Sequence, residues 1–182
     1  MRFVRTYPGA VDGALAAELI ALPGGAKMDE DYRRCSVTPV VGDVLERFRG
    51  VVRECFADYR ASSPRTLAFC TLLEQPNVLR YEPSADRPEL FHEHADAWNV
   101  ASATRQVSVI AYLNDVVEGG ETVFTLFDYT QRCQKGTMLL FPSSFIYHHL
   151  ARPPESGPKV VVVTWLHFGN GGTPRYVTSR LG

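Results

Sequence analysis

The segment 90-LFHEHADAWN-99 concentrates side chains that can bind a metal ion. It holds His92, Glu93, His94 and Asp96. Side chains of an extended strand alternate between its two faces, so both histidines and the aspartate would share one face, with the glutamate on the other. Two residues separated by one position can then bind the same ion, either as His92 with His94 or as His94 with Asp96. This segment alone leaves both pairings open.

The surrounding sequence favours the pairing of His94 with Asp96. A pair of His92 and His94 would indicate a cupin, in which a glutamate follows a few residues later, but 97-AWNV-100 contains none and the expected upstream glycine is missing. Either histidine of the distal segment 145-FIYHHLARPPESGPKVVVVTW-165 would add a second imidazole. Two imidazoles and one carboxylate form a facial triad, which leaves positions on Fe(II) for a co-substrate and O2.

Lys159 is the second unusual group. It begins a run of four valines, and strand alternation places it on one face with two of them and Trp165. A lysine on the interior face of a barrel is costly unless an anion neutralises it, and a ligand carboxylate can supply that anion. The alternative is a lysine at the end of a strand that extends its ammonium group into solvent.

Two helices and a series of short strands must position these groups. Leucines at three- and four-residue spacing predict a helix in 12-DGALAAELIAL-22, with Asp12 as its N-cap, and a similar pattern predicts a second helix in 42–60, with Asp43 as a cap. Runs rich in β-branched and aromatic residues predict strands at 67–74, 77–82, 105–114, 121–127, 137–142 and 159–168.

This order of elements indicates a mainly β (α+β) fold, a sandwich or barrel buttressed by helices. We expect one domain over residues 1–182, with helical support in about 1–65 and the β core in about 66–170.

Composition narrows the class of partner. The 182 residues carry a formal net charge of -1 and 21% of them are charged, so there is no basic footprint for nucleic acid or an anionic membrane. No segment has the continuous apolar stretch of a signal peptide or a membrane span. Four widely spaced cysteines without a CxxC pair favour free thiols. We therefore expect a soluble cytoplasmic protein that binds neither nucleic acid nor membranes.

Residues 77–168 resemble the catalytic core of the Fe(II)/2-oxoglutarate-dependent dioxygenases, in particular the prolyl 4-hydroxylase-like group. The matching pieces occur in the family's order: 79-LRYEP-83, 91-FHEHAD-96, Arg105 with 112-YLND-115, 118-EGGETVF-124, 135-KGTMLLF-141, and the segment from His149 through 157-GPK-159 to Trp165. The resemblance covers about half of the chain. It implies a double-stranded β-helix (jelly-roll) core with helices supporting it.

The resemblance also assigns the metal ligands. The family places ten residues between its distal histidine ligand and the basic residue that binds 2-oxoglutarate; the count to Lys159 is ten from His149 and eleven from His148. It therefore implies that His94, Asp96 and His149 are catalytic residues that bind Fe(II). The implied co-substrates are 2-oxoglutarate and O2, and ascorbate is a further candidate cofactor.

By the same resemblance, Lys159 and Tyr112 would bind the distal carboxylate of 2-oxoglutarate, and Tyr81 would line the pocket near the metal. Arg105 and Trp165 would contact the substrate. For the tyrosines and the tryptophan, the alternative is an ordinary place in the core of the barrel.

The activity implied by the resemblance is hydroxylation of an unactivated C–H bond, with release of succinate and CO2. The short segment before the core favours a small molecule, such as an amino acid or a related metabolite, over peptidyl proline. Arg105, Arg33 and Arg34 are candidates for holding a substrate carboxylate. Two less favoured interpretations are a non-catalytic metal-binding sensor and a cupin-type metalloenzyme that uses His92, His94 and His149.

Overall fold

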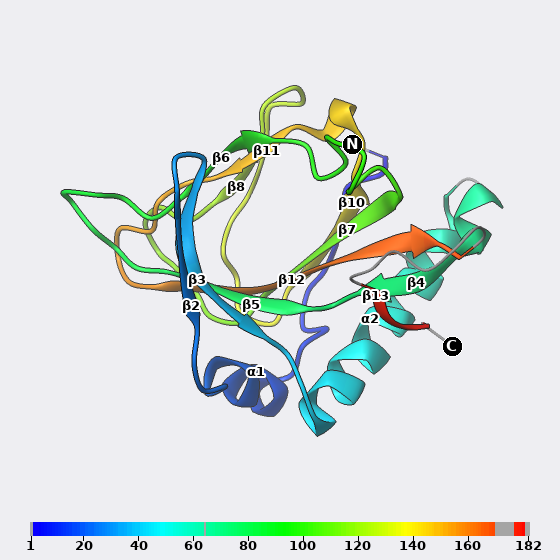
Figure 1. Cartoon of the computed structure of the whole chain (residues 1–182), viewed down its shortest axis with the longest axis horizontal. Coiled ribbons are helices and arrows are strands. Elements are labelled where there is room, and N and C mark those ends of the chain that lie inside the picture. The colour runs from blue at the N-terminus through cyan, green and yellow to red at the C-terminus, as the bar shows by residue number, and fades with distance from the viewer. Residues whose placement is uncertain (1, 64, 170–176, 181–182) are drawn as a thin grey trace.

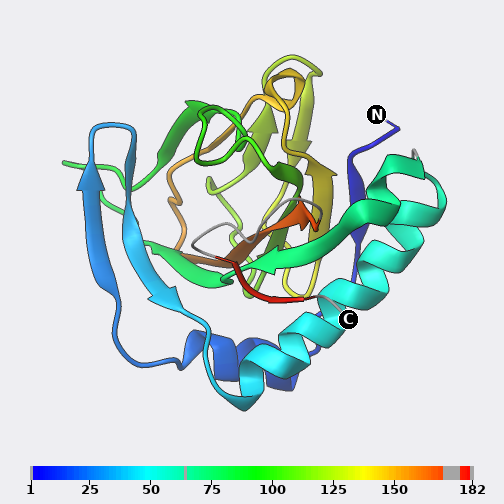
Figure 2. The same ribbon diagram turned by 45° about the vertical axis from the view of Figure 1, so that its right-hand side comes forward.

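Antiparallel strands form a strongly curled sheet, and two helices lie along its outer face (Figure 1, Figure 2). The computed structural model describes residues 2–63, 65–169 and 177–180, so both ends of the expected domain, Met1 and Gly182, lie outside it. The expected mainly β fold buttressed by helices is confirmed.

The helices are α1 (Gly13–Ile20) and α2 (Asp43–Ala61), with short 3-10 turns η1 (Arg65–Phe69) and η2 (Phe145–Tyr147). The strands are β1 (Arg5–Tyr7), β2 (Ala26–Glu30), β3 (Arg33–Pro39), β4 (Cys70–Glu74), β5 (Asn77–Tyr81), β6 (Phe91–His94), β7 (Arg105–Tyr112), β8 (Thr122–Phe124), β9 (Tyr129–Gln131), β10 (Met138–Pro142), β11 (His149–Ala151), β12 (Lys159–Phe168) and β13 (Val177–Arg180). None of the described helices is long and apolar enough to cross a membrane.

Strand β12 is the centre of the sheet. It pairs with β7 along one edge and with β5 and β4 along the other, so Val162 lies between Ala111 and Val78. Through the sheet, the order continues as β1-β10-β7-β12-β5-β3-β6-β11-β8-β9. The curl of this long sheet brings β6 and β11 over the inner face of β12 (Figure 1).

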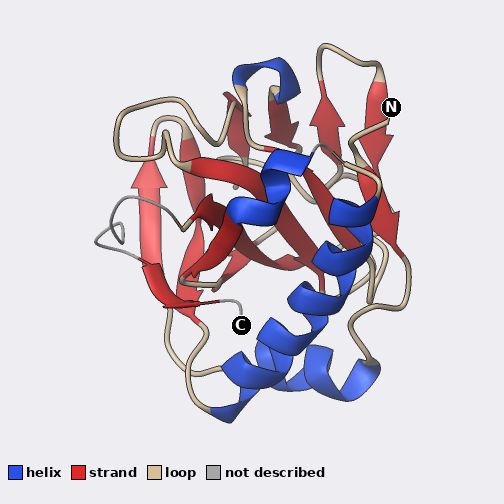
Figure 3. Ribbon diagram, turned by 90° about the vertical axis from the view of Figure 1, so that its right-hand side faces the viewer, coloured by secondary structure: helices blue, strands red, loops and turns tan. Residues whose placement is uncertain are grey.

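The two faces of β12 serve different purposes because its side chains alternate. Val160 and Val162 belong to the core beneath the helices, together with Leu19 of α1 and Phe48 of α2. Figure 3 shows α2 lying across the strands on this side. Val161 faces the inside of the curl, in a second apolar cluster. One strand thus supports the helix-packed core and the inner cavity at once.

The N-terminal third contains more β structure than its sequence predicts. Helix α1 begins as predicted after Asp12, whose Oδ1 accepts a hydrogen bond from the Leu15 N–H at 2.8 Å. The prediction of Asp43 as the cap of α2 is wrong, because Gly42 occupies that position with a φ of 71°.

The expected helical support in about 1–65 also needs correction, because residues 26–39 form the hairpin of β2 and β3. This segment has a weak local strand signal, and the pairing of β3 with β5 and β6 determines its conformation. Upstream of β4, residues 65–69 form the 3-10 turn η1 rather than the start of a strand.

The paired glycines of 118-EGGET-122 form a tight turn in which both have positive φ, 73° at Gly119 and 76° at Gly120. A Cβ added to Gly119 would lie 2.3 Å from the carbonyl oxygen of Pro153. One added to Gly120 would lie 3.6 Å from Cδ of Lys159. The turn therefore needs glycine at both positions for the positive φ, and at Gly119 also for the close approach of the Pro153 carbonyl.

We expect Phe48→Ala to lower the free energy of unfolding by about 3–5 kcal/mol, because the ring is completely buried between α2 and the sheet. Urea denaturation measures this change. The matched control is Phe145→Ala, since that ring is 70% exposed, and its effect should stay within about 0.5 kcal/mol. Equal effects of the two substitutions would contradict this division between core and surface.

Candidate metal and co-substrate site

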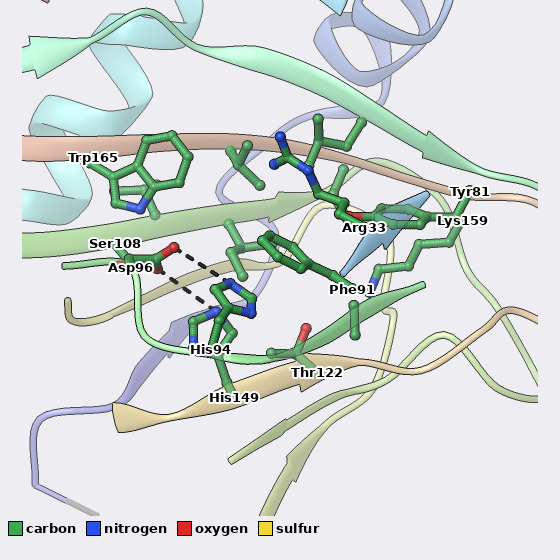
Figure 4. A pocket seen from close by; sticks show the side chains of 16 residues that line it. Arg33, Tyr81, Phe91, His94, Asp96, Ser108, Thr122, His149, Lys159 and Trp165 are labelled. Atoms are coloured by element: carbon green, nitrogen blue, oxygen red, sulfur yellow. Dashed lines mark hydrogen bonds and ion pairs between the residues drawn. The ribbon is translucent and has the colours of Figure 1, made fainter. Parts of the chain in front are cut away.

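Pairing of β6 with β11 brings the metal-binding groups together. His94 ends β6 and His149 begins β11, and the two residues are direct partners across the antiparallel pair. Asp96 lies in the bend that follows β6. The change of chain direction at this bend, rather than strand alternation, places its carboxylate beside the histidines. Its Oδ1 lies 3.7 Å from Nε2 of His94 and its Oδ2 lies 3.8 Å from Nε2 of His149, as Figure 4 shows.

These three residues form the one group of potential metal ligands found among the described residues, with their ligand atoms within 4.8 Å of one another. Both imidazoles are oriented in the same way. His94 Nδ1 donates to the carbonyl oxygen of His92 at 2.7 Å, and His149 Nδ1 donates to that of Tyr147 at 3.0 Å. A carbonyl can only accept, so each Nδ1 carries the proton and each Nε2 presents a lone pair toward Asp96.

Asp96 is buried but has strong support for its negative charge. Burial alone would raise its pKa, but the neighbouring His149 and His94 and the Ser108 hydroxyl together hold the pKa of Asp96 below its usual value. Ser108 donates to Oδ2 at 2.5 Å, and Ser143, 2.8 Å from Ser108, must then donate to that hydroxyl. The carboxylate is therefore ionised and held in one orientation.

His149 is kept neutral by its surroundings. Burial lowers its pKa to about 4, against the opposing effect of Asp96. Phe141 lies edge-on to its ring at 4.8 Å between centroids, and Phe91 stacks on His94 at 3.5 Å. A neutral imidazole is the form that binds a metal, so the site is prepared to accept one without losing a proton from His149.

The neighbouring histidines lie outside this group. His92 is exposed, and the Nδ1 of His148 lies 3.7 Å from Oε1 of Glu93. The choice of His149 over His148 agrees with this geometry. The cupin interpretation is wrong, because His92 is not among the grouped ligands.

Lys159 lies in the same cavity, away from the mouth. Its side chain is only 2% exposed, and among the described residues it has no hydrogen bond or ion pair. Burial lowers its pKa, while the thiol of Cys133 and the carboxylate of Glu121 oppose that change. Tyr81, its direct partner on β5, lies with its ring 5.5 Å from Nζ. Lys159 is a buried cation in need of an anion.

The structure separates the two predicted tyrosines. Tyr81 lines the cavity. Tyr112 is completely buried behind it, and its hydroxyl donates to Oγ1 of Thr122 at 2.8 Å. Thr122 is the residue that reaches the cavity. The hydroxyl hydrogen of Thr122 remains available to a ligand, because its oxygen is the acceptor in that bond.

Arg105 and Trp165 lie together at the mouth of the cavity. The Arg105 guanidinium lies 3.6 Å above the Trp165 ring and donates to both carboxylate oxygens of Glu74 at 2.8 and 2.5 Å. Its Nη1 also donates to the backbone carbonyl of Asp96 at 3.2 Å. His167, fully buried, contacts the same carboxylate at 2.8 Å. Arg105 thus has a protein partner for its charge and braces the Asp96 turn.

Residues 76–167 match the 2OG-Fe(II) oxygenase superfamily. The chain belongs to this superfamily. A comparison with curated protein sequences gives no match.

Solved structures of similar fold include two prolyl hydroxylases. The viral collagen prolyl hydroxylase of Paramecium Bursaria Chlorella virus-1 shares 19% identity, over 91% of this chain and 96% of its own, with a TM-score of 0.69. A Pseudomonas putida prolyl-4-hydroxylase shares 14% identity, over 92% and 94%, with a TM-score of 0.70. The alpha ketoglutarate dependent epimerase SnoN from nogalamycin biosynthesis shares 15%, over 100% and 91%, with a TM-score of 0.66. The likeness confirms the jelly-roll fold.

In this 2OG-Fe(II) oxygenase, the metal triad consists of His94, Asp96 and His149. Two imidazole nitrogens and one ionised carboxylate oxygen suit Fe(II). The cavity that they share with the unpaired Lys159 suits a co-substrate with a carboxylate, so the residues fit both Fe(II) and 2-oxoglutarate.

Sequence reasoning misses Ser108 and Thr122. The sequence gives one indication that Ser108 is functional: it is a polar residue on the inner side of β7, where Ile110 also faces the cavity. Thr122 lies at the end of a segment whose paired glycines indicate only a structural turn. Neither residue can be connected with its partner, Asp96 or Tyr112, without the strand register.

We expect His149→Ala to reduce Fe(II) affinity by more than about 100-fold, because it removes a direct ligand. Anaerobic calorimetric titration with Fe(II) measures the affinity. His148→Ala and His92→Ala are the controls and should bind iron normally, because neither side chain joins the triad. Loss of iron binding in His92→Ala with retention in Asp96→Ala would restore the cupin interpretation.

Ser108→Ala should weaken Fe(II) binding by roughly 10–100-fold, because the Asp96 carboxylate loses the hydroxyl that orients it. The same titration applies. Ser143→Ala leaves the bond from Ser108 to Asp96 in place and should have a smaller effect. If both serine variants matched the wild type, the orientation of Asp96 would have to come from the chain turn alone.

Proposed function

We propose that this enzyme hydroxylates an unactivated C–H bond of a small molecule, an amino acid or a related metabolite, and releases succinate and CO2. The observation that carries the proposal is one cavity containing the metal triad and the buried Lys159, which has no ion pair in the described part of the chain. An enclosed cation beside an Fe(II) site provides for a dicarboxylate co-substrate that binds the metal at one end and the protein at the other.

In this proposal, the residues around the co-substrate have distinct roles. Lys159 forms an ion pair with the distal carboxylate of 2-oxoglutarate, and Thr122 donates its hydroxyl hydrogen to the same group. Tyr112 acts through Thr122, whose oxygen it holds at 2.8 Å. Tyr81 packs beside Lys159 and excludes water from the ion pair. The triad holds Fe(II), which with O2 and 2-oxoglutarate supplies the oxidising power for the C–H bond.

The protein controls position and solvent access around this chemistry. Val161 and Val163 of β12 line the cavity between Lys159 and Trp165, so the path from the anion site to the mouth is apolar. Apolar walls strengthen the ion pair and keep water from the reacting centre. Ascorbate is proposed only as a reductant that maintains iron in the Fe(II) state.

Peptidyl proline is the second candidate substrate. The mouth of the cavity is bordered by Tyr32 and Trp98, which are 47% and 69% exposed, and aromatic side chains of this kind can bind an extended peptide. Two of the structures similar in fold are prolyl hydroxylases by their own names. The intact triad and cavity favour either enzyme over a non-catalytic sensor.

We further propose that the enzyme works in the cytoplasm. All four cysteines are free and buried, as expected for a reducing compartment.

Lys159→Ala should raise the dissociation constant for 2-oxoglutarate by roughly 10–100-fold, the loss expected for one hydrogen bond to a charged group. The measurement is an anaerobic titration of the Fe(II)-loaded protein with 2-oxoglutarate, followed by the visible charge-transfer band of the chelate. Lys135→Ala removes an exposed lysine and serves as the control. A wild-type protein without the band, or a Lys159→Ala variant with unchanged affinity, would refute the proposed function or the role of the lysine, respectively.

A further inference from the structure

A second cation without a carboxylate partner lines the cavity. Arg33, at the start of β3, borders both the inner part beside the triad and the mouth. Its Nε–H is directed at the sulfur of Met28 at 2.7 Å, a weak acceptor, and it has no ion pair with any described residue. Arg105, the other arginine at the mouth, is neutralised by Glu74. Among the described residues, Arg33 is therefore the arginine at the mouth that has no carboxylate partner.

Two nearby acidic groups form ion pairs with other residues, and Glu30, the cross-strand partner of Arg33, has no ion pair with it in the described part of the chain. On the segment that faces β3, Glu89 pairs with Lys27 at 2.6 Å. On the adjacent strand β2, Asp29 pairs with Arg87 at 2.7 Å. No carboxylate of these elements lies within ion-pair distance of Arg33 among the described residues.

The position of Arg33 is fixed relative to the iron site. Arg33 and Phe91 are direct partners across β3 and β6, and the guanidinium carbon lies 4.9 Å from the centre of the Phe91 ring. Phe91 in turn stacks on His94. Arg33, Phe91 and His94 thus form one stack (Figure 4). The Phe91 ring lies between the guanidinium of Arg33 and the imidazole of His94. Lys159 lies apart, beside Tyr81.

Besides Arg33, the Arg105–Glu74 ion pair and Asn77, the mouth has several apolar and aromatic side chains. Trp165, Trp98, Tyr32 and Val37 line it. A carboxylate at Arg33 would leave the remaining part of a small molecule between these side chains and the iron ligands.

We propose that Arg33 binds the carboxylate of the primary substrate, so that the enzyme acts on carboxylic acids with an apolar body. The inference rests on the proposed function and adds the chemical group by which the substrate is recognised. The carboxylate belongs either to a free amino acid or related acid, or to the C-terminus or an acidic side chain of a peptide. Lys159 would then bind the distal carboxylate of 2-oxoglutarate, and Arg33 would bind the carboxylate of the substrate.

The strand supplies a matched control. Arg34 is half-buried like Arg33 but points to the opposite face of β3, where its Nε–H donates to the carbonyl oxygen of Pro88 at 2.9 Å. It does not line the cavity. Arg34→Ala therefore removes another half-buried arginine from the same strand without changing the charge at the mouth.

The experiment measures succinate release by the Fe(II)-loaded enzyme with 2-oxoglutarate and O2. The probes are the free L-amino acids, their primary amides, and proline-containing peptides, both with and without acidic side chains, with a free or amidated C-terminus. We expect at least one free acid to stimulate turnover with a KM at least about 10-fold below that of its amide. Arg33→Ala should raise the KM for this acid by roughly 10–100-fold and abolish the preference over the amide.

Two further results belong to the expectation. Arg33→Lys should keep part of the preference, because it keeps the charge, and Arg34→Ala should behave as the wild type. The affinity of Arg33→Ala for 2-oxoglutarate, from the anaerobic absorption titration, should stay within about twofold of the wild type. A preference for free acids over peptides, or the reverse, identifies the source of the carboxylate.

Four results would overturn the inference. These are equal use of acid and amide, no stimulation by any carboxylate of the panel, an unchanged KM in Arg33→Ala, or a loss in that variant of 2-oxoglutarate affinity instead of substrate affinity. In each case, a normal charge-transfer band in the wild-type protein shows that binding of Fe(II) and 2-oxoglutarate, on which the proposed function depends, is intact. Absence of the band in the wild type removes the proposed function and the inference together.

Discussion

The pairing of β6 with β11 is the constraint on which the site depends. It places His94 opposite His149, although the two are more than fifty residues apart in the chain, and it gives Asp96 a position between their Nε2 atoms. Since β11 also pairs with β8 and β6 with β3, this small part of the sheet is held on both sides. A one-residue shift in the β6–β11 register would turn one imidazole away from the other and destroy the triad. The curl of the sheet is therefore a catalytic requirement as well as a packing arrangement.

The fold treats the two buried charges of the cavity differently. Asp96 is supported by Ser108, by Ser143 behind it and by the imidazoles, and its backbone carbonyl is held by Arg105. Lys159 is buried to the same degree without any ion pair among the described residues. An unpaired buried cation reduces stability, and such local costs are characteristic of functional sites. Asp96, which holds the metal, is thus oriented by the protein in advance. Lys159 has no ion-pair partner among the described residues and is available to the co-substrate.

Much of the metal site can be predicted from sequence, because its information is local or depends on a fixed count. The two-residue spacing of His94 and Asp96, together with the ten-residue spacing between distal histidine and basic residue that the family resemblance implies, identifies these two residues, His149 and Lys159. Alternation along β12 predicts that Lys159 and Trp165 share one face, and both line the cavity. The partners Ser108, Thr122 and Glu74 cannot be found in this way, because each depends on the register between distant strands. The hairpin of β2 and β3 escapes prediction for the same reason: its conformation depends on pairing with β5.

The division between metal site and mouth has a consequence for stability. The metal ligands come from β6, the bend after it and β11, whereas the co-substrate region comes largely from β12 and β7, which form the middle of the sheet with their outer faces packed under the helices. Arg33 comes from the hairpin, in which β2 pairs only with β3 and has no fully buried side chain. Ion pairs such as Lys27–Glu89 and Asp29–Arg87 link this hairpin to the loop between β5 and β6, and exposed pairs of this kind contribute little free energy. Local opening therefore requires less free energy at β2 than at the triad. Substitutions in β2 can change the mouth while β3 keeps its pairing with β5 and with β6, the strand that carries His94.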